Sequence, residues 1–386
     1  MKPAIPIHLP SLQLDWETLV PALSEANRAI ARFDGILTHL RNPELLTTPL
    51  TTREAVLSSK IEGTVVTVGE VLRFEAGDEP EQESKRLDIE EIVNYRMALR
   101  SAQWDLGTRP FCLNLVLKLH KILLTSVRGQ NKAPGSFRRF QNHIGRPGSQ
   151  LEEAEFVPPA PEVLKDALGE WEKYYHSTEK DPLTQLALIH AQFEYLHPFL
   201  DGNGRIGRIL IPLFLYDKQI LSSPTFYLSE YLEENRDEYI GHLRELGKDN
   251  ASWTRWCLFF LHGLTLQADR NVLRVKAVLD LYERLKDDML ARNGSRFTIP
   301  MLDAMFAQPI FQAGSLLEQK GMPQRANLMR QLGALVDTKV LKVLTVGSGR
   351  RATVYSLHEL VKLCESKPSA RTSKVRSGIT VARRSK

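Results

Sequence analysis

The sequence predicts a mainly α-helical protein, in which a helical bundle with a small β-hairpin is followed by a separate C-terminal module. Apolar residues recur at helical spacing through most of residues 16–292. Short alternating segments bounded by glycine and proline occur near residues 139–156 and 339–355. The 386 residues exceed what one hydrophobic core usually supports, so we expect two or three domains.

The composition is typical of a globular protein, with 42% hydrophobic and 25% charged residues. There is no run of about 18 apolar residues, which excludes a membrane-spanning helix, and the first residues lack the apolar core of a signal peptide. The cysteines, Cys112, Cys257 and Cys364, are far apart and form no CxxC pair, which favours free thiols in a reducing compartment. We therefore expect a cytoplasmic location and no membrane contact.

The N-terminal region, residues 1–110, is predicted to be helical. A first helix spans residues 16–39, and Thr51 with Glu54 has the spacing of a capping box that opens a second helix at residues 53–62. Gly63 is expected to end this helix in the C′ position. An exposed loop at 78–86 and a helix at 87–101 follow.

Residues 111–264 are predicted to form the helical bundle. Asp181-Pro182 is a strong helix start, because the acid can cap and proline suits the first helical position. The segment 206–218 is apolar on nearly all sides and is therefore expected at the centre of the bundle. A hairpin is predicted from a strand at 139–144, a turn at 146–149 and a return near Phe156. The other helices are predicted at 113–124, 161–175, 183–196, 234–246 and 253–264.

Residues 265–294 are predicted to be a linker helix, continuous over 272–292. Residues 295–363 then contain three short helices and two strands, the pattern of a winged helix-turn-helix. The helices are expected at 298–306, 311–320 and 323–335, and the strands at 339–346 and 351–355.

The remaining residues, 364–386, are basic in composition, because seven Lys and Arg residues and no acid follow Glu365. Subtracting these seven charges from the net charge of +5 leaves −2 for the rest of the chain. Such a composition predicts a disordered tail, which either stays solvated or contacts nucleic acid or an acidic partner.

The loop between helices 183–196 and 206–218 carries the most specific chemical pattern. Two glycines flanking Asn203 allow left-handed backbone, and the following helix points the positive end of its dipole at the same place. Arg205 and Arg208 suit phosphate oxygens, and Asp201 is a candidate ligand for the Mg²⁺ that accompanies nucleotide phosphates. The predicted nucleotide-binding stretch comprises Gly202, Asn203, Gly204, Arg205, Ile206, Gly207 and Arg208.

His197 precedes this stretch and is the nearby group able to accept a proton at neutral pH. Together these groups favour attack of a hydroxyl, deprotonated by His197, on a phosphorus held by the loop. A zinc site formed by His197 and Asp201 is the alternative, but no third ligand is evident and the arginines would repel the cation.

The segment from His197 to Arg208, HPFLDGNGRIGR, resembles the HPFxDGNGRxxR signature of Fic domain proteins without a departure. The resemblance identifies residues 111–264 as a Fic-type helical bundle with a β-hairpin flap. It implies an ATP-dependent nucleotidyltransferase that moves AMP from ATP to a Ser, Thr or Tyr hydroxyl of a target protein or of itself. It also implies that His197 is the base, Asp201 holds Mg²⁺, and Arg208 meets the γ-phosphate of ATP or an inhibitory glutamate.

The segment Ser58-Ser59-Lys60-Ile61-Glu62-Gly63 is similar to the inhibitory motif of that family, [S/T]xxxE[G/N]. An acid at the C-terminal end of a helix lies at the negative end of the dipole, which is unfavourable without a compensating cation. The resemblance implies that Glu62 pairs with Arg208 and displaces the γ-phosphate. Ser58, Glu62 and Gly63 are therefore the predicted inhibitory residues.

The segment Pro134-Gly135-Ser136-Phe137-Arg138 resembles the entry to the family's flap, so Gly135, Phe137 and Arg138 are predicted to help dock the target. An exposed hairpin edge can bind an extended segment by strand addition. Tyr231, Asn235 and Tyr239 lie at helical spacing and could line the adenine and ribose pocket. Of these three we retain Asn235 as a nucleotide-binding residue.

Other functions stay open at this point. The same cradle could transfer another phosphate-containing group or remove AMP, or it could act as the nucleotide sensor of a DNA-binding transcriptional regulator. Gln324, Arg325, Asn327 and Arg330 of the predicted recognition helix, with Arg350 and Arg351 of the wing, could contact DNA. Winged helices also dock proteins or form homodimers. The target protein, the modified residue, the oligomeric state and the signal that relieves inhibition are not specified by the sequence.

Overall fold

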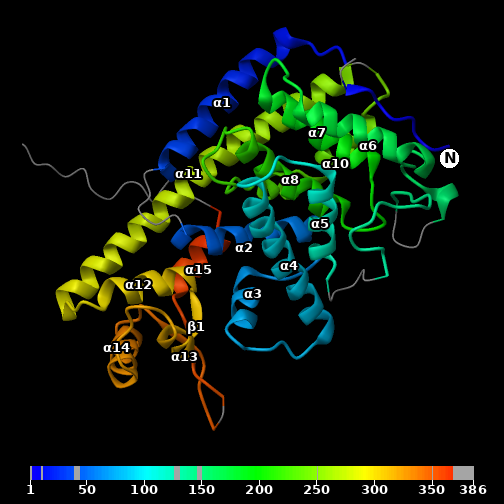
Figure 1. The fold of residues 1–386 in the computed structure, drawn as a ribbon. Coiled ribbons are helices and arrows are strands. Elements are labelled where there is room, and N and C mark those ends of the chain that lie inside the picture. The colour runs from blue at the N-terminus through cyan, green and yellow to red at the C-terminus, as the bar shows by residue number, and fades with distance from the viewer. Residues whose placement is uncertain are drawn as a thin grey trace, which may run out of the picture.

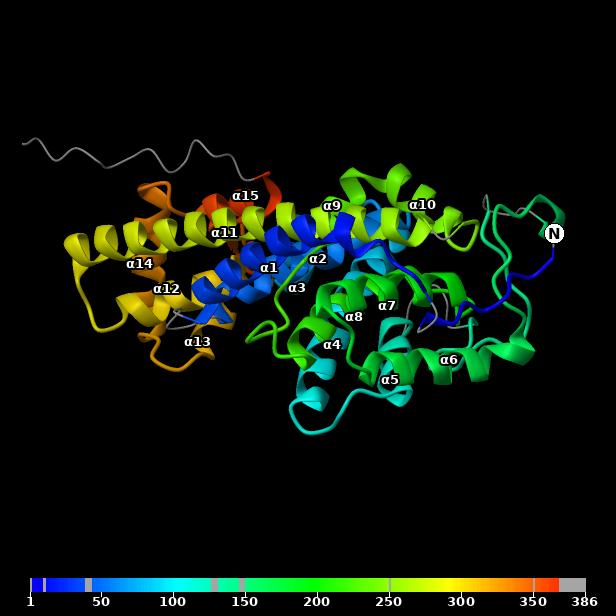
Figure 2. The same ribbon diagram turned by 90° about the horizontal axis from the view of Figure 1, so that it is seen from above.

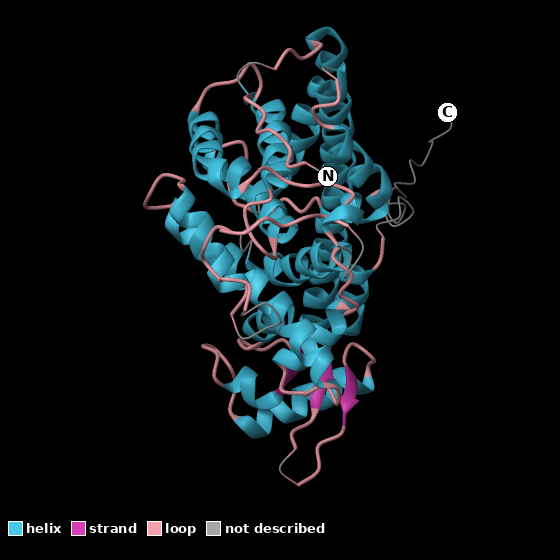
Figure 3. Ribbon diagram, turned by 90° about the vertical axis from the view of Figure 1, so that its right-hand side faces the viewer, coloured by secondary structure: helices cyan, strands magenta, loops and turns pink. Residues whose placement is uncertain are grey.

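The long helix α11 (Ala251–Asn293) runs along one edge of the molecule, with α1 (Trp16–Thr38) packed beside it (Figures 1 and 2). This computed structural model describes residues 2–9, 12–38, 44–125, 131–145, 150–249, 251–349 and 351–367. The buried stripe of α1 has helical spacing and includes Leu19, Leu23, Ala26, Ile30, Phe33 and Leu37. The fold is mainly α-helical, as predicted, and the strands lie together at one end (Figure 3).

Helix α11 replaces the two separate helices predicted at 253–264 and 272–292. The residues between them, Thr265 to Asn271, contain no proline or glycine and continue the helix without interruption. The predicted boundary between residues 264 and 265 therefore falls inside one rigid element. Within the part of the chain that the structure describes, no helix combines the length and apolarity needed to cross a membrane.

Helix α2 spans Glu44–Ile61 and begins nine residues before the predicted start at Arg53. The capping box predicted at Thr51 and Glu54 is wrong, because both residues lie inside the helix and have tertiary partners. Thr51 Oγ1 and the Tyr227 hydroxyl are 2.6 Å apart, and Glu54 accepts a hydrogen bond from Ser229 Oγ at 2.5 Å. The predicted end is confirmed, since Gly63 follows the helix with a φ of +98°.

Two further helices complete the N-terminal region. Helix α3 (Val68–Glu75) was not predicted, although Thr67 and Glu70 form a capping box with both reciprocal hydrogen bonds. Helix α4 (Glu83–Leu106) begins and ends beyond the predicted residues 87–101, so the exposed loop is shorter than residues 78–86.

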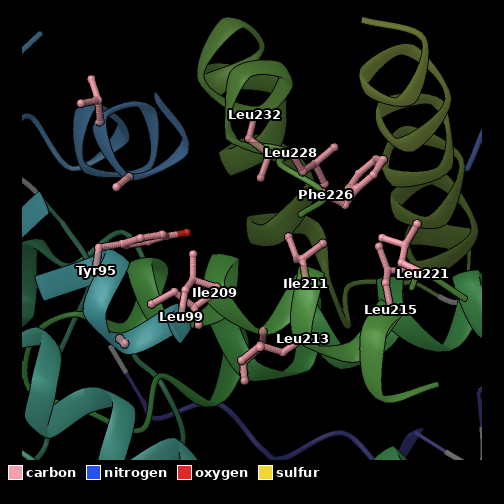
Figure 4. Close-up of a cluster of buried hydrophobic side chains, with 14 of the residues drawn as sticks. Tyr95, Leu99, Ile209, Ile211, Leu213, Leu215, Leu221, Phe226, Leu228 and Leu232 are labelled. Carbon is pink, nitrogen blue, oxygen red and sulfur yellow. The ribbon is translucent and has the colours of Figure 1, made fainter. Parts of the chain in front are cut away.

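The central bundle consists of α5 (Leu113–Leu123), α6 (Pro161–His176), α7 (Pro182–Leu196), α8 (Asn203–Asp217), α9 (Ser229–Glu234) and α10 (Arg236–Glu245), with a 3₁₀ turn at Leu151–Glu153. Helix α8 is buried along almost its whole length, as predicted. Figure 4 shows Tyr95 and Leu99 of α4 beside Ile209, while Ile211 points toward Phe226 and Leu228. The core therefore surrounds α8 and fixes the position of its N-terminus.

The predicted hairpin does not form as two strands. A single antiparallel bridge joins Ile144 to Phe156, and the residues described on either side are irregular. The predicted turn, residues 146–149, lies outside the described residues. Side-chain contacts account for the irregular backbone: Gln141 and Asn142 donate hydrogen bonds to the carbonyl oxygens of Pro158 and Phe199.

The C-terminal module contains α12 (Thr298–Ala307), β1 (Ile310–Gln312), α13 (Ala313–Leu317), α14 (Arg325–Asp337), β2 (Lys342–Thr345), β3 (Val354–Ser356) and α15 (His358–Glu365). Its antiparallel sheet has the order β1-β3-β2, with Phe311 opposite Tyr355 and Val343 also opposite Tyr355. The strand β1 lies in a segment predicted to be helical, and α15 was not predicted. The assignment of the module as a winged helix-turn-helix stays a prediction.

A buried polar network attaches this module to α2. Arg53 donates hydrogen bonds to the carbonyl oxygens of Cys364 and Glu365 at 2.6 and 2.8 Å, at the C-terminal end of α15. Its other nitrogen contacts Glu230 of α9 at 2.7 Å, and Arg274 of α11 contacts the same carboxylate at 3.0 Å. We call Arg53, Glu230 and Arg274 the buried triad; all three side chains are at most 10% exposed.

Candidate active site

The loop between α7 and α8 is shaped by two left-handed residues. His197 ends α7 with φ of 48° and ψ of 61°, and Gly202 precedes α8 with φ of +80°. A histidine seldom adopts this conformation, so neighbouring contacts must hold it. Arg138 supplies two of them: its Nε donates to the His197 carbonyl and its backbone N–H to the Pro198 carbonyl, both at 2.9 Å.

Asn203 closes the same loop on itself. Its Oδ1 accepts from the Phe199 amide at 2.7 Å, and its Nδ2 donates to the Phe199 carbonyl at 2.9 Å. Both ends of the side-chain amide are thus used within the protein. Asn203 therefore orders the loop, and the backbone amides at the start of α8 are left to face an anion.

Each arginine of the predicted phosphate site is buried and paired with a carboxylate. Arg205 contacts Glu91 of α4 and, at 3.0 Å, Asp201 Oδ1. Arg208 contacts Glu62 Oε1 at 2.6 Å. The arginine side chains are 5% and 2% exposed, so these ion pairs are poorly screened by solvent.

Two of the predicted inhibitory residues, Ser58 and Glu62, converge on Arg208. Its Nε donates to Ser58 Oγ at 2.8 Å, and its Nη2 donates to the Ser58 carbonyl at 2.9 Å as well as to Glu62. Burial alone would raise the pKa of Glu62, but the charge and hydrogen bond of Arg208 outweigh it and lower that pKa below its usual value. Glu62 is consequently ionised at neutral pH.

Glu62 also lies directly on the N-terminal turn of α8. A Cβ atom built on Gly204 would be 2.3 Å from Glu62 Oε1 and 2.8 Å from Arg208 Nη1. Glycine at this position is therefore what allows the carboxylate to approach the helix. Gly63, the third predicted inhibitory residue, turns the chain away immediately after Glu62.

His197 faces the same cavity as Glu62 and Arg208. Burial lowers the pKa of His197 to about 4, against the smaller opposing effect of the Glu62 carboxylate. At neutral pH the imidazole is therefore uncharged and has a lone pair available to accept a proton.

The cavity has a volume of about 430 Å³, within the range of small-molecule sites. Its polar lining includes Glu194 and Arg236, which were not predicted from the sequence, and Tyr239, which was considered but not retained. Glu194 is 9% exposed, its Oε1 has no hydrogen-bond partner among the described residues, and burial raises its pKa to about 7. The apolar lining includes Ile144, Phe156, Ile240 and Leu243.

Asn235 does not line this cavity, in contrast to the expectation from spacing. It lies at the junction of α9 and α10, where its Nδ2 donates to the Tyr231 carbonyl at 2.8 Å. It faces a second cavity of about 600 Å³ together with Tyr231 and Phe259. The break between the two helices separates Tyr231 from Tyr239, so the three residues do not share a helical face.

The residues expected to dock the target are only partly accessible. Arg138 is 3% exposed and donates to the carbonyl oxygens of Leu196 and Pro159 as well as to His197, so it caps the end of α7. Phe137 packs on the Phe199 ring with a centroid distance of 5.4 Å. Gly135 has a φ of +75° and lies against α5. These three residues therefore hold the loop, and their role in docking a target stays a prediction.

Asp201 fits the predicted role of Mg²⁺ ligand in its chemistry. Its side chain is 38% exposed, and Oδ1 accepts a hydrogen bond from Arg205. Mg²⁺ is commonly bound by one or two carboxylates together with water and substrate phosphates. Among the residues that the structure describes, no three acidic, histidine or cysteine side chains form a metal site, so phosphate oxygens would have to complete the coordination.

Comparison with protein families gives two adjacent matches. Residues 20–104 match the model described as Fic/DOC family N-terminal, and residues 110–215 match the model described as Fic/DOC family. The second match contains the whole loop from His197 to Arg208. The first contains α2 and the predicted inhibitory residues Ser58, Glu62 and Gly63.

Two curated proteins are similar to part of the chain. "Protein adenylyltransferase Fic" from Drosophila virilis is 30% identical over 129 residues, which cover 32% of this chain and 24% of that protein. A "Probable protein adenylyltransferase" from Aquifex aeolicus is 33% identical over 93 residues, which cover 24% of this chain and 27% of that protein. The chain thus spans about a quarter of the length of these relatives.

Solved structures share the fold at lower identity. A Fic family protein from Desulfovibrio desulfuricans superposes with a TM-score of 0.56 at 18% identity, over 92% of this chain and 98% of that one. Fic-1 from C. elegans gives a TM-score of 0.52 at 18% identity, over 67% and 74% of the two chains. At this identity the similarity concerns the fold alone.

Proposed function

Because the chain carries the Fic/DOC family domain at residues 110–215 and the family's N-terminal region at residues 20–104, we propose that it is a protein adenylyltransferase inhibited by its own Glu62. In the proposed reaction AMP moves from ATP to a Ser, Thr or Tyr hydroxyl of a target protein or of this chain itself. The observation that carries the proposal is one cavity in which a neutral His197 faces Arg208 at the start of α8.

The residues suit each part of this reaction. His197 accepts the proton of the target hydroxyl, whose oxygen then bonds to the α-phosphorus of ATP. The bond from that phosphorus to the oxygen of the β-phosphate breaks, and pyrophosphate leaves with the electron pair. The amides at the start of α8 and the Arg205 guanidinium hold phosphate oxygens. Asp201 would hold Mg²⁺, which would neutralise phosphate charge.

The proposed inhibition follows from the occupancy of Arg208. In the structure its donors are directed to Ser58 and Glu62, so a γ-phosphate could use this guanidinium only after Glu62 had moved. A hydrogen bond between charged groups stabilises a protein by about 1.5–3 kcal/mol. Displacing it would therefore reduce productive ATP binding by roughly 10- to 100-fold.

Purified Glu62→Gly protein incubated with Mg²⁺ and α-labelled ATP tests the proposal. We expect it to incorporate AMP roughly 10- to 100-fold faster than the unchanged protein, because Arg208 becomes available to the γ-phosphate. Adding His197→Ala should then reduce incorporation by about 10²–10⁴. Lys60→Ala is the matched control, since Lys60 lies on the same helix end but pairs with Glu233.

The result also separates the alternatives. Mass spectrometry of the product should show the added mass of AMP, and γ-labelled ATP should leave no label on the protein. Transfer of the γ-label would instead indicate a phosphotransferase. If Glu62→Gly incorporated no more AMP than Lys60→Ala, inhibition by Glu62 would be excluded. A nucleotide-sensing DNA-binding regulator would keep its function in His197→Ala.

A further inference from the structure

A buried histidine outside the signature loop connects two parts of the site. His120 lies on α5 and is 0% exposed. Its Nδ1 accepts a hydrogen bond from the Gly135 amide at 2.9 Å, and its Nε2 lies 3.0 Å from the carbonyl oxygen of Asp201. Its ring stacks on Phe199 with a centroid distance of 3.7 Å and an interplanar angle of 13°.

These contacts define the tautomer of His120. The Gly135 amide can only donate, so Nδ1 must be the unprotonated nitrogen. The Asp201 carbonyl can only accept, so Nε2 carries the proton and donates it. An imidazolium would direct a second N–H at the Gly135 amide and lose that bond. Burial lowers the pKa of His120 to about 4; the Asp201 carbonyl and carboxylate raise it by less, and the Arg205 charge lowers it further.

The two partners of His120 belong to different functional segments. Asp201 is the expected Mg²⁺ ligand, and its carbonyl precedes Gly202, whose left-handed backbone starts α8. Gly135 begins the segment that continues to Arg138, which in turn holds the His197 carbonyl. A Cβ on Gly135 would be 3.0 Å from Lys121 Cβ, so this segment already lies tightly against α5. The His120 imidazole therefore holds the backbone at two places, at Asp201 within the loop between α7 and α8 and at Gly135 in the segment beside it.

We propose that His120 is a positioning residue for the AMP-transfer reaction. Its two hydrogen bonds hold Asp201 and the segment Gly135–Arg138 in fixed positions relative to His197. This inference rests on the proposed function for its kinetic part only. Phe199 contributes packing, but only the imidazole joins the two backbones by hydrogen bonds. Displacement of a reacting group by about 1 Å can cost about 10² in rate, so loss of both bonds should reduce turnover by roughly 10- to 100-fold.

The test compares His120→Phe with His176→Phe, both in the full-length Glu62→Gly protein. Phenylalanine keeps a ring to stack on Phe199 but removes both hydrogen bonds. His176 is the matched control, because its Nε2 also contacts a backbone carbonyl, that of Phe111 at 3.0 Å, away from the loop. We expect kcat for AMP transfer to fall roughly 10- to 100-fold only in His120→Phe, with KM for ATP changed less than about threefold.

Hydrogen exchange provides a readout that does not depend on activity. Since the Gly135 amide loses its acceptor, peptides covering residues 131–138 should exchange faster in His120→Phe than in His176→Phe, while peptides from α11 should not. Equal exchange at 131–138 together with equal kcat would overturn the proposal. If Glu62→Gly transfers no AMP, the proposed function fails, but the exchange difference still decides whether His120 holds this segment.

A further measurement applies if His120→Phe does not fold. In the ¹⁵N spectrum of the Glu62→Gly protein at neutral pH, the signals assigned through His120→Gln should be those of a neutral imidazole protonated at Nε2. A charged ring or the opposite tautomer would contradict the two hydrogen bonds and with them the proposal.

Discussion

At the residue scale, the contact between Glu62 and Arg208 joins two segments separated by 146 positions in the chain. The Glu62 side chain is 41% exposed and the Arg208 side chain 2%. The carboxylate therefore reaches the cavity, whereas the guanidinium is enclosed by the protein. Ser58 adds two hydrogen bonds to the same guanidinium. The conformation of Arg208 is therefore determined by α2 and not by α8, which carries it.

The lowered pKa of Glu62 predicts a pH-dependent contribution to stability. Because the folded-state pKa lies below the unfolded value of about 4.3, the stabilisation is complete above that value and is lost as pH falls through the folded pKa. We expect Tm of the unchanged protein to exceed that of Glu62→Gln at pH 7, and the difference to shrink as the pH falls below about 4.3. Thermal unfolding between pH 3 and 7 measures it.

The control for that comparison is Glu25→Gln on the exposed face of α1. The difference in Tm between Glu25→Gln and the unchanged protein should stay the same across this pH range. A difference for Glu62→Gln that grew toward low pH would contradict the ion pair as the source of stabilisation.

The residues of the site that could be predicted are those that lie together in the sequence. His197, Asp201, Arg205 and Arg208 fall within twelve residues, and a dipole, two glycines and two guanidiniums indicate phosphate chemistry directly. His120, Glu194 and Tyr239 have no local pattern, because their role arises from packing of separate helices. The grouping of Tyr231, Asn235 and Tyr239 used helical spacing, whereas the chain breaks between α9 and α10.

At the element scale, two successive turns of α2 make different contacts. At the C-terminal end Ser58 and, just beyond it, Glu62 contact Arg208; one turn earlier Glu54 bonds to Ser229 while Arg53 reaches α15. The sequence predicted its C-terminus through Gly63 but not its start. Polar residues such as Thr51 resemble a cap in sequence, and only their tertiary partners reveal that they lie inside the helix.

Arg53 is expected to contribute strongly to stability. Arg53→Met would remove the hydrogen bonds from the Arg53 guanidinium to the carbonyl oxygens of Cys364 and Glu365. It would also remove one of the two arginines that pair with Glu230. Removal of one partner from a buried ion pair typically costs about 3–5 kcal/mol, so we expect the free energy of unfolding to fall by about 3 kcal/mol. Urea unfolding measures the change.

Lys60→Met on the same helix is the comparison, since Lys60 and Glu233 form a pair in which the lysine is 55% exposed. Surface pairs contribute about 0–1 kcal/mol, so this variant should differ little from the unchanged protein. Equal losses in the two variants would show that the buried triad does not stabilise the fold in the way inferred.

At the scale of the whole molecule, the helical class, the central position of α8 and the order of helices in the bundle were predictable, because apolar periodicity and Asp181-Pro182 are local signals. The two-stranded hairpin did not form, and one of its backbone acceptors, the Pro158 carbonyl, accepts a hydrogen bond from the Gln141 side chain instead. The continuity of α11 was also missed. Helix propensity through residues 265–271 and packing against α1 maintain the helix.

The predicted contact of the C-terminal module with DNA depends on α14. Arg325 and Arg330 are exposed there, whereas Arg351 is engaged with Asp78 at 2.8 Å, and Arg350 lies outside the described residues. If duplex DNA docks on α14, the logarithm of the affinity should fall linearly with that of salt concentration. Arg325→Gln should reduce the slope by about one unit, as measured by fluorescence anisotropy.

Arg28→Gln, on an exposed face of α1, should leave that slope unchanged. Binding that does not depend on salt, or no binding to any duplex, would exclude DNA as a partner. Protein docking or dimerisation would then be the remaining predicted roles of this module.

The placement of α2 in the core also constrains how often the site can open. Ala55, Ser58 and Ser59 are 0% exposed and Ile61 is 5% exposed, so the helix cannot swing away without exposing apolar surface. Unwinding of its last turn alone exposes fewer of these residues and is a local unfolding event, on a scale of microseconds to seconds. The population of this opened state would limit the basal rate of the proposed AMP transfer, and every 1.4 kcal/mol added to the free energy of opening would lower that rate about tenfold.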